Sequence, residues 1–509
     1  MLSSLILLWI GFGLLFFLFR TRRPKNFPPG PRPIPIFGNL LQLNLADLLN
    51  DLRKAPHNMP IHFISIFRDK CKLSERYGKV YSIYIGRKPA VVLNGVQAMK
   101  EALATQSLVF AGRPQDLMIN HAGEFKGVAL TTGPIWKEHR RFALITLRNF
   151  GLGKQSMEER ILGEISYITS HLEKNAGKAI DPQILFHKAA FNIICSVLIG
   201  IRFKHEDEFL KLNIHYITES TTILNGPWAM IYDMLPLLRH LPLPFQKVFQ
   251  NSANMRKSLG EQVSQHKKTR VPGEPRDLTD CYLDEMEKRG DDGSSFSEKQ
   301  LIACLLDLLF AGTDTTSNTL LFAFLHLMTH PDVQERCQKE IDEVLGEKEQ
   351  ASFEDRHMMP YTQAMIHEAQ RVADTVPLSA FHATTKDTRL MGYDIPKGTL
   401  IIPNLSSVLN EESQWKFPHD FNPSNFLNDK GEFVKPEAFM PFSAGARVCL
   451  GEGLARMELF LILVTLLRRF KFVWPEDAGV PDYTPIFGIT QGPKPYRLGV
   501  RLRDRASLH

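Results

Sequence analysis

The segment 441–451 constrains this chain more than any other stretch, because it places a cysteine in a glycine-rich turn just before an apolar helical pattern. It reads Pro-Phe-Ser-Ala-Gly-Ala-Arg-Val-Cys-Leu-Gly, with Arg447 two residues before Cys449 and Gly451 two residues after it. Glycines let the backbone turn sharply and bring N–H groups towards the sulfur. A helix over 454–470 directs its positive N-terminal end to the same place. Both features lower the pKa of a thiol, and the thiolate is the form that binds metal. The segment therefore predicts a metal-binding thiolate; the alternative is an inert buried cysteine.

The spacing of five residues in this segment resembles the haem-binding signature of the cytochrome P450 monooxygenases: Phe442, Gly445, Arg447, Cys449 and Gly451. In that family the cysteine is the axial thiolate of haem iron and favours O–O cleavage. The resemblance implies that haem b is the cofactor and that Cys449 ligates its iron. It also implies that Phe442, Arg447 and Gly451 contact the cofactor.

Other residues match the contacts that this family makes with the haem propionates. Trp136 and Arg140 match its Trp-x-x-x-Arg pattern, and His382 matches a further propionate contact. Arg113 lies in a glycine-rich, irregular segment, 107–132, and is assigned to cofactor binding by the same resemblance. That segment also suits a loop over a pocket.

The longest helical pattern in the body of the chain is 297–329, which begins with a capping box formed by Ser297 and Gln300. Its centre, 311–316, reads Ala-Gly-Thr-Asp-Thr-Thr, which is poor helix material. We expect the helix to be interrupted there, since Thr side chains bond back to carbonyls and bend helices. A tolerated kink is the alternative. The stretch resembles the oxygen-activating motif of the family, which implies that Asp314 and Thr315 are a catalytic acid–alcohol pair beside the iron.

Glu368 and Arg371 are three residues apart, so their side chains meet on a helix. The pair falls where the cytochrome P450 family has its structural Glu-x-x-Arg pair. The arginine that usually completes this network is replaced by Asn425. The resemblance therefore implies a simpler buried network.

Residues 2–19 carry no charge and are long enough for a membrane-spanning helix. A cleaved signal peptide is the alternative, but no basic segment precedes the run and no small-residue cleavage site follows it. We expect a transmembrane anchor over 1–20, a basic and proline-rich hinge over 21–39, and a haem-thiolate monooxygenase domain over 40–509. The basic cluster after the anchor places the catalytic domain in the cytosol. The resemblance to the family implies that this membrane is that of the endoplasmic reticulum. The segment 47–60 looks like extra length without an assigned role.

The net charge is +6, and four of these charges come from the basic cluster after the anchor, so a nucleic-acid-binding surface is not indicated. The six cysteines form no CxxC pair, which fits a reducing compartment. A basic helix begins at Trp136 and is either a solvated face or, by resemblance, the docking site of NADPH–cytochrome P450 reductase, with cytochrome b5 as a further candidate. Its basic residues are Lys137, Arg141, Arg148 and Lys154.

The resemblance covers nearly the whole chain and implies a mainly α fold with small β-sheets (α+β), in which a single haem lies between helices. An alternating pattern over 80–94 predicts one hairpin. Segments 147–153 and 192–195 resemble the vertebrate microsomal family 2, near its J subfamily.

The activity implied is the insertion of one oxygen atom from O₂ into a lipophilic small molecule, with electrons from NADPH. Two alternatives are a haem-thiolate isomerase of peroxides and a non-catalytic haem-binding sensor or carrier. Polyunsaturated fatty acids are the first substrate class and lipophilic xenobiotics the second. The residues expected to line the substrate pocket are Phe110, Phe310, Ala311, Val376, Leu378 and Ile489.

Overall fold

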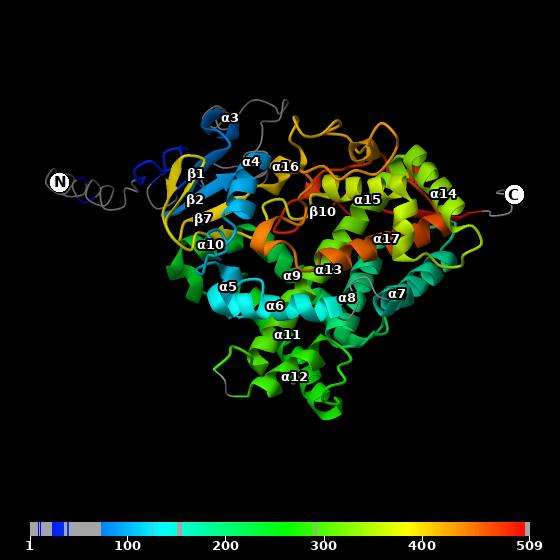
Figure 1. The fold of residues 1–509 in the computed structure, drawn as a ribbon, viewed down its shortest axis with the longest axis horizontal. Coiled ribbons are helices and arrows are strands. Elements are labelled where there is room, and N and C mark those ends of the chain that lie inside the picture. The colour runs from blue at the N-terminus through cyan, green and yellow to red at the C-terminus, as the bar shows by residue number, and fades with distance from the viewer. Residues whose placement is uncertain are drawn as a thin grey trace.

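Helices dominate the computed structural model, which describes residues 9, 11, 23–34, 38–39, 73–124, 126–149, 155–290 and 293–503 (Figure 1). This confirms the expected helix-rich fold. The α-helices are α3 (Leu73–Tyr77), α4 (Gly95–Met99), α5 (Met118–Ala122), α6 (Gly133–Asn149), α7 (Gln155–Lys174), α8 (Pro182–Leu198), α9 (Glu208–Asn225), α10 (Pro227–Met234), α11 (Gln246–Thr269), α12 (Leu278–Arg289), α13 (Glu298–Thr329), α14 (Pro331–Leu345), α15 (Pro360–Ala373), α16 (Leu405–Leu409) and α17 (Glu452–Arg469). Short turns of other helix types are η2 (Lys100–Thr105), η3 (Pro236–His240), η4 (Phe353–Met358), η5 (Pro423–Phe426), η6 (Gly445–Arg447) and η7 (Glu476–Ala478).

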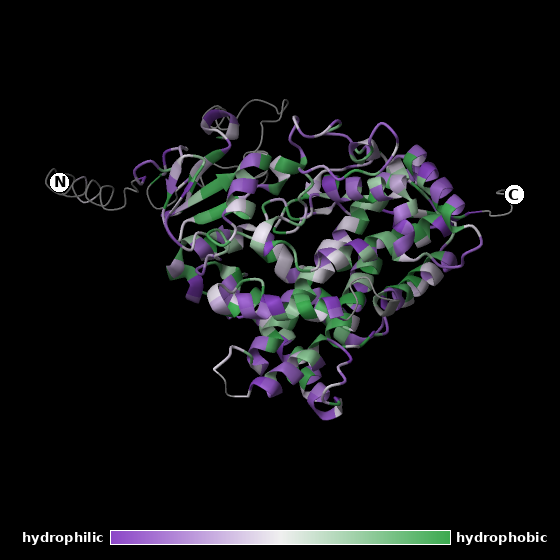
Figure 2. Cartoon of the chain, in the orientation of Figure 1, coloured by the Kyte–Doolittle hydropathy of each residue, from purple (hydrophilic) through white to green (hydrophobic). Residues whose placement is uncertain are grey.

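The largest sheet has the strand order β1-β2-β7-β4. β1 (Val80–Ile85) and β2 (Lys88–Leu93) form the predicted antiparallel hairpin, with Ile85 opposite Lys88. β2 runs parallel to β7 (Leu400–Pro403), and β4 (His382–Ala383) closes the other side. In Figure 2 these strands are mostly green, and most of their residues are buried. The sheet thus brings His382 against the segment that carries Phe110.

The other sheets are small, with two or three strands each. β11 (Leu498–Leu502) pairs with β3 (Ala179–Ile180) and β8 (Phe470–Val473). The remaining pairs are β5 (Thr388–Leu390) with β6 (Tyr393–Ile395) and β9 (Pro485–Ile486) with β10 (Gly492–Pro493).

The helix α13 runs through the main hydrophobic core and packs along α8. Gly312 is required at this crossing, because a Cβ there would lie 2.9 Å from Cγ1 of Ile194. The Ser297 hydroxyl accepts the N–H of Gln300 at 3.3 Å, as expected of the N-terminal cap. The Gln300 side chain donates to the Gly127 carbonyl instead, so the reciprocal half of the capping box does not form.

The predicted interruption of this helix at 311–316 is wrong: α13 is continuous from Glu298 to Thr329. Two threonine hydroxyls bond back as expected, from Thr313 to the Leu309 carbonyl and from Thr315 to the Ala311 carbonyl. These bonds add to the helix without breaking its backbone ladder. Packing of the buried face in the core outweighs the weak propensity of glycine and threonine.

Several expectations lie outside the described residues. These are nearly all of the predicted anchor (2–19), the extra segment 47–60 and Lys154. Within the parts of the chain that are described, no helix combines the length and the apolar character needed to cross a membrane.

Candidate functional site

The predicted thiolate, Cys449, lies in the turn between η6 and α17, and its N–H donates to the Phe442 carbonyl at 3.0 Å. Gly445 has φ +72°, and a Cβ there would lie 1.5 Å from the carbonyl oxygen of Leu103. Only glycine therefore lets this turn pack against η2. Among the cysteines that the structure describes, Cys449 is the exposed one; Cys281 is half-buried, and Cys195, Cys304 and Cys337 are buried. Cys449 is thus the described thiol that is open to a ligand.

The net pKa of this thiol differs from the sequence-based expectation. Burial by the surrounding protein raises the pKa of the Cys449 thiol, although the residue as a whole is exposed. The expected opposing effects are present, since the N–H groups of Gly451 and Glu452 and the charge of Arg140 lower the pKa. They do not outweigh burial, so the predicted net lowering is wrong for the thiol alone. A coordinating metal ion deprotonates a thiol outright.

Three arginines from separate parts of the chain, Arg113, Arg140 and Arg447, form a cradle beside this turn. Arg447 donates to the carbonyls of Ala111 at 2.9 Å and Thr131 at 2.5 Å. Arg140 donates to the Val448 carbonyl at 2.5 Å. Arg113 donates to the carbonyls of Ala129, Ala380 and Phe381. Sequence distance hides this cluster; only the fold brings its members together.

The arginine cradle carries positive charge without a paired carboxylate. Within the described residues, none of the three arginines forms an ion pair. Burial, together with the charges of Arg113 and Arg140, lowers the pKa of Arg447 to about 8. Burial and the charge of Arg140 lower the pKa of Arg113 to about 10, although Asp307 partly opposes this. A site that disfavours its own cations in this way is suited to an anionic ligand.

Trp136 and His382 complete the cradle. The Arg447 guanidinium lies 3.8 Å from the centre of the Trp136 ring. The Trp136 Nε1 atom is buried and has no hydrogen-bond partner, which is costly unless a ligand accepts its proton. His382 Nδ1 lies 2.6 Å from the Phe110 carbonyl, and burial lowers the pKa of His382 to about 3. The orphaned donor and the unpaired guanidinium groups fit the two carboxylates of haem b.

On α13, Asp314 and Thr315 are in different surroundings. Thr315 is half-buried, and its hydroxyl donates to the Ala311 carbonyl at 2.8 Å. Asp314 is buried; one of its oxygens accepts the Thr490 hydroxyl, and the other lies 3.5 Å from His187 Nε2. Sequence reasoning missed His187 and Thr490, because both reach Asp314 only through the tertiary packing.

The six expected pocket residues do not form one cluster. Phe110 is fully buried in the core beside the large sheet, and Leu378 packs in a second cluster on that sheet. Phe310 is half-buried against the helical core, Val376 is half-buried, and Ala311 is exposed. Ile489 is 38% exposed, and its N–H donates to Asn225 Oδ1 at 2.5 Å. Asn225, at the end of α9, is a contact that the sequence did not indicate. The pocket assignments stay predictions.

The pair Glu368 and Arg371 meets as expected, on α15. Both side chains are fully buried, with 2.7 Å between Arg371 Nε and Glu368 Oε2 and 2.7 Å between Nη2 and Oε1. Asn425 Nδ2 donates to Glu368 Oε1 at 3.1 Å, so the amide does occupy the third place of this network. Arg371 also donates to the carbonyls of Leu409, Phe417, Pro418 and Asp420. The pair therefore ties α15 to the segment 409–425.

The basic face of α6 borders an apolar groove of about 470 Å³. Lys137 and Arg141 are exposed along it, and no ion pair in the described structure engages them. Its apolar wall includes Leu108, 56% exposed, and Ile145, 50% exposed. A groove lined by both basic and apolar residues is more typical of a docking site for a protein than of a face that only contacts water.

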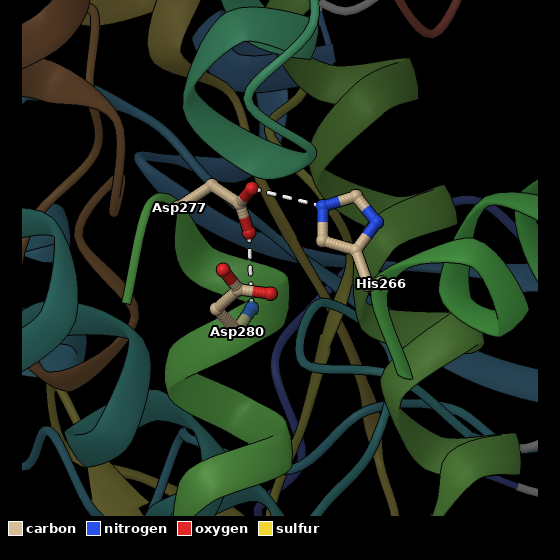
Figure 3. A group of neighbouring side chains, drawn as sticks. All are labelled: His266, Asp277 and Asp280. Carbon is tan, nitrogen blue, oxygen red and sulfur yellow. Dashed lines mark hydrogen bonds and ion pairs between the residues drawn. The ribbon is translucent and has the colours of Figure 1, made fainter. Parts of the chain in front are cut away.

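A separate cluster of His266, Asp277 and Asp280 has the composition of a metal site (Figure 3). Its polar atoms are already engaged. Asp277 caps α12 by accepting the Asp280 N–H at 2.9 Å, and its other oxygen lies 2.9 Å from His266 Nε2. Arg276 binds both oxygens of Asp280, with Nε at 2.6 Å. The cluster is therefore a structural clamp between α11 and α12.

This clamp predicts a pH dependence of stability. Burial by itself lowers the pKa of His266, but the hydrogen bond to Asp277, the Gln262 carbonyl and the charges of Asp277 and Asp280 raise it above its usual value. The stabilisation is thus complete below the unfolded pKa of about 6.5 and is lost as the pH rises through the higher folded pKa. Urea unfolding should show that His266→Gln lowers the free energy of unfolding, relative to the parent protein, most strongly at low pH. A loss that does not vary with pH would contradict this assignment.

Comparisons with known proteins agree with this geometry. The model of the family described as Cytochrome P450 matches residues 28–500. Cytochrome P450 2F2 of Mus musculus is 42% identical over 484 residues, which cover 94% of this chain and 94% of that protein. Cytochrome P450 2D3 of Rattus norvegicus is 43% identical over 486 residues, covering 94% and 93%. Cytochrome P450 2B4 of Oryctolagus cuniculus is 40% identical over 503 residues, covering 97% and 98%.

These relatives confirm the expected similarity to the vertebrate family 2, and the nearness to the J subfamily stays a prediction. The family match spans the thiolate turn, the arginine cradle and α13 together. The chain therefore belongs to the cytochrome P450 family, whose members bind haem b, and it is a cytochrome P450 monooxygenase that acts on lipophilic substrates.

Proposed function

We propose that this protein oxygenates polyunsaturated fatty acids at the membrane of the endoplasmic reticulum, with electrons that reach it from NADPH through a flavoprotein reductase. Lipophilic xenobiotics are the second substrate class. The observation that carries the assignment of the site is the unpaired cradle of Arg113, Arg140 and Arg447 beside the exposed thiol of Cys449. When bound there, haem supplies the oxygen chemistry at an iron held by the Cys449 thiolate.

The cradle would hold the cofactor by its carboxylates. Arg113, Arg140, Arg447 and Trp136 supply donors for the carboxylates, and His382 lies at the same edge. Phe442 and Gly451 flank the thiolate, and a Cβ at position 451 would lie 4.0 Å from the sulfur. These residues would thus set the orientation of the cofactor.

Thr315 and Asp314 manage protons during the reaction. The Thr315 proton is directed to the Ala311 carbonyl, so the hydroxyl oxygen is left to accept a hydrogen bond from water. A water held in this way can hand on a proton, and Asp314, one residue away, can replace it. An isomerase of peroxides needs no such proton supply, so the pair favours the monooxygenase over that alternative.

We expect Thr315→Ala to lower the product formed per NADPH about tenfold, with most of the difference appearing as hydrogen peroxide. The carbon monoxide spectrum of the reduced protein should not change, because the thiolate is untouched. Product, NADPH and peroxide are measured in membranes reconstituted with the reductase, with a polyunsaturated fatty acid and with a small xenobiotic. An unchanged ratio with both substrates would exclude the proton role, and the absence of oxygenated fatty acid would exclude the first substrate class.

The groove on α6 is the docking site for the reductase. Lys137, Arg141 and Arg148 are exposed on this helix, and Lys154 extends the same basic run. Charge complementarity mainly accelerates encounter and is screened by salt. The exposed Leu108 and Ile145 add an apolar contact. Cytochrome b5 is a second candidate for the same face.

Reversal of two charges, Lys137→Glu with Arg141→Glu, should slow reductase-driven turnover about tenfold at low ionic strength. The difference should shrink as salt is added. Turnover driven by an organic hydroperoxide needs no reductase and should be spared. The matched control reverses two exposed lysines of α11, Lys257→Glu with Lys268→Glu, and should behave like the parent protein. Equal losses by both routes would instead indicate a defect in haem binding or folding.

The location follows from the N-terminal sequence. Residues 2–19 form an uncharged run, and Arg20, Arg22 and Arg23 follow it. An anchor of this polarity leaves the catalytic domain in the cytosol, where it meets a membrane-bound reductase.

A further inference from the structure

The carboxyl group of Asp314 is held from two sides by residues far from it in the sequence. The Thr490 hydroxyl donates to Oδ2, and the Nε2 atom of His187 lies 3.5 Å from Oδ1. All three side chains are at least nine-tenths buried: His187 is 5%, Asp314 5% and Thr490 9% exposed. Among the described residues, neither His187 nor Asp314 forms an ion pair with any other group.

The other nitrogen of His187 determines where its proton lies. Nδ1 is 2.8 Å from the carbonyl oxygen of Gln183, and a carbonyl oxygen only accepts. Nδ1 therefore carries a proton. Nε2 then faces the carboxylate either with a lone pair, which is repelled, or with a second proton, which is attracted. The contact therefore favours one proton held between the imidazole and the carboxyl group.

His187 lies near the start of its helix, where several residues are exposed. His187 lies on α8, one helical turn after the start of the helix, where Asp181, Gln183 and Ile184 are exposed. Asp314 lies at mid-length on α13, where it is buried. The crossing of the two helices thus places an imidazole from the first part of α8 beside the buried acid at the middle of α13.

We infer that His187 is a positioning residue for the reaction, which holds a proton against Asp314 and restores the one that Asp314 gives up. The proton on Nε2 moves to Oδ1, and the imidazole becomes neutral while its Nδ1–H stays on the Gln183 carbonyl. Bulk water, which reaches His187 over the 5% of its surface that is exposed, then returns one proton to Nε2. Thr490 serves both states, since a hydroxyl can donate to a carboxylate or accept from a carboxylic acid. This inference rests on the proposed proton role of Asp314.

The test uses His187→Gln, whose amide can still donate to Asp314 but cannot carry an extra proton. With NADPH and reductase, we expect the product formed per NADPH to fall about three- to tenfold. Turnover driven by an organic hydroperoxide and the spectral affinity for substrate should stay within about twofold. The solvent deuterium isotope effect on NADPH-driven turnover should rise. The matched control is His326→Gln, which replaces another buried histidine, on α13 but facing Phe421; it should leave the product ratio unchanged.

A second readout does not depend on turnover. In urea unfolding, His187→Gln and Asp314→Asn should be non-additive, because each change removes the same proton-sharing contact. Additive losses would overturn the inference, as would an unchanged product ratio in His187→Gln or equal loss by both routes of turnover. The variant Asp314→Asn distinguishes a failure of the proposed role of Asp314 from a failure of the role of His187. If it leaves the product ratio unchanged, the proposed role of Asp314 fails. If it lowers the ratio while His187→Gln does not, only the role of His187 fails.

Discussion

Cys449→Ser is expected to abolish the red-shifted carbon monoxide band of the reduced protein and to lower turnover by more than about 100-fold. Loss of an outer contact to a metal ligand typically costs 10- to 100-fold, and this change removes the ligand itself. A serine hydroxyl has nearly the same shape as the thiol, so the turn should persist with its N–H on the Phe442 carbonyl. The chemical change is the replacement of a soft, electron-rich thiolate by a hard alcohol oxygen.

The control for this experiment is Cys281→Ser, which alters another described cysteine, one that is half-buried and on the surface helix α12. It should keep both the band and the turnover. Survival of the band in Cys449→Ser would show that another group ligates the iron, and the assignment of the turn would fall.

Arg371→Met is expected to destabilise the protein by about 3–5 kcal/mol, because it leaves a buried carboxylate without its partner. That is a large part of the 5–15 kcal/mol by which proteins are usually stable. Glu368 is fully buried, and its remaining partners among the described residues would be the N–H of Asn422 and the amide of Asn425. Four backbone carbonyls would lose the same guanidinium donor.

The measurements are thermal unfolding and the fraction of protein that binds haem. The double change Glu368→Leu with Arg371→Met should be less harmful than Arg371→Met alone, because it removes both charges. The exposed pair Lys339 and Glu343 on α14 provides the contrast, since Lys339→Met should change stability little. A mild effect of Arg371→Met would mean that the ion pair has no structural role.

The sequence by itself determined the elements that depend on local spacing. The glycines around Cys449, the i and i+3 positions of Glu368 and Arg371, and the hairpin over 80–94 are patterns of neighbouring residues. Local geometry dictates which of their side chains meet. The structure therefore contains the Glu368–Arg371 pair and the hairpin as predicted. Resemblance to the cytochrome P450 family extended this to the fold and the cofactor, because the motif residues recur in the same order.

The tertiary structure decided whatever depends on balances between distant groups. Local propensity predicted an interruption at 311–316, but burial in the core keeps α13 continuous. The glycine-rich turn and the helix end predicted a lowered pKa for the Cys449 thiol, but desolvation by the surrounding chain outweighs both effects. The contact of His187 with Asp314 joins α8 to α13, and the arginine cradle joins three separate segments. Such outcomes depend on burial and charge summed over the whole fold, which no stretch of sequence contains.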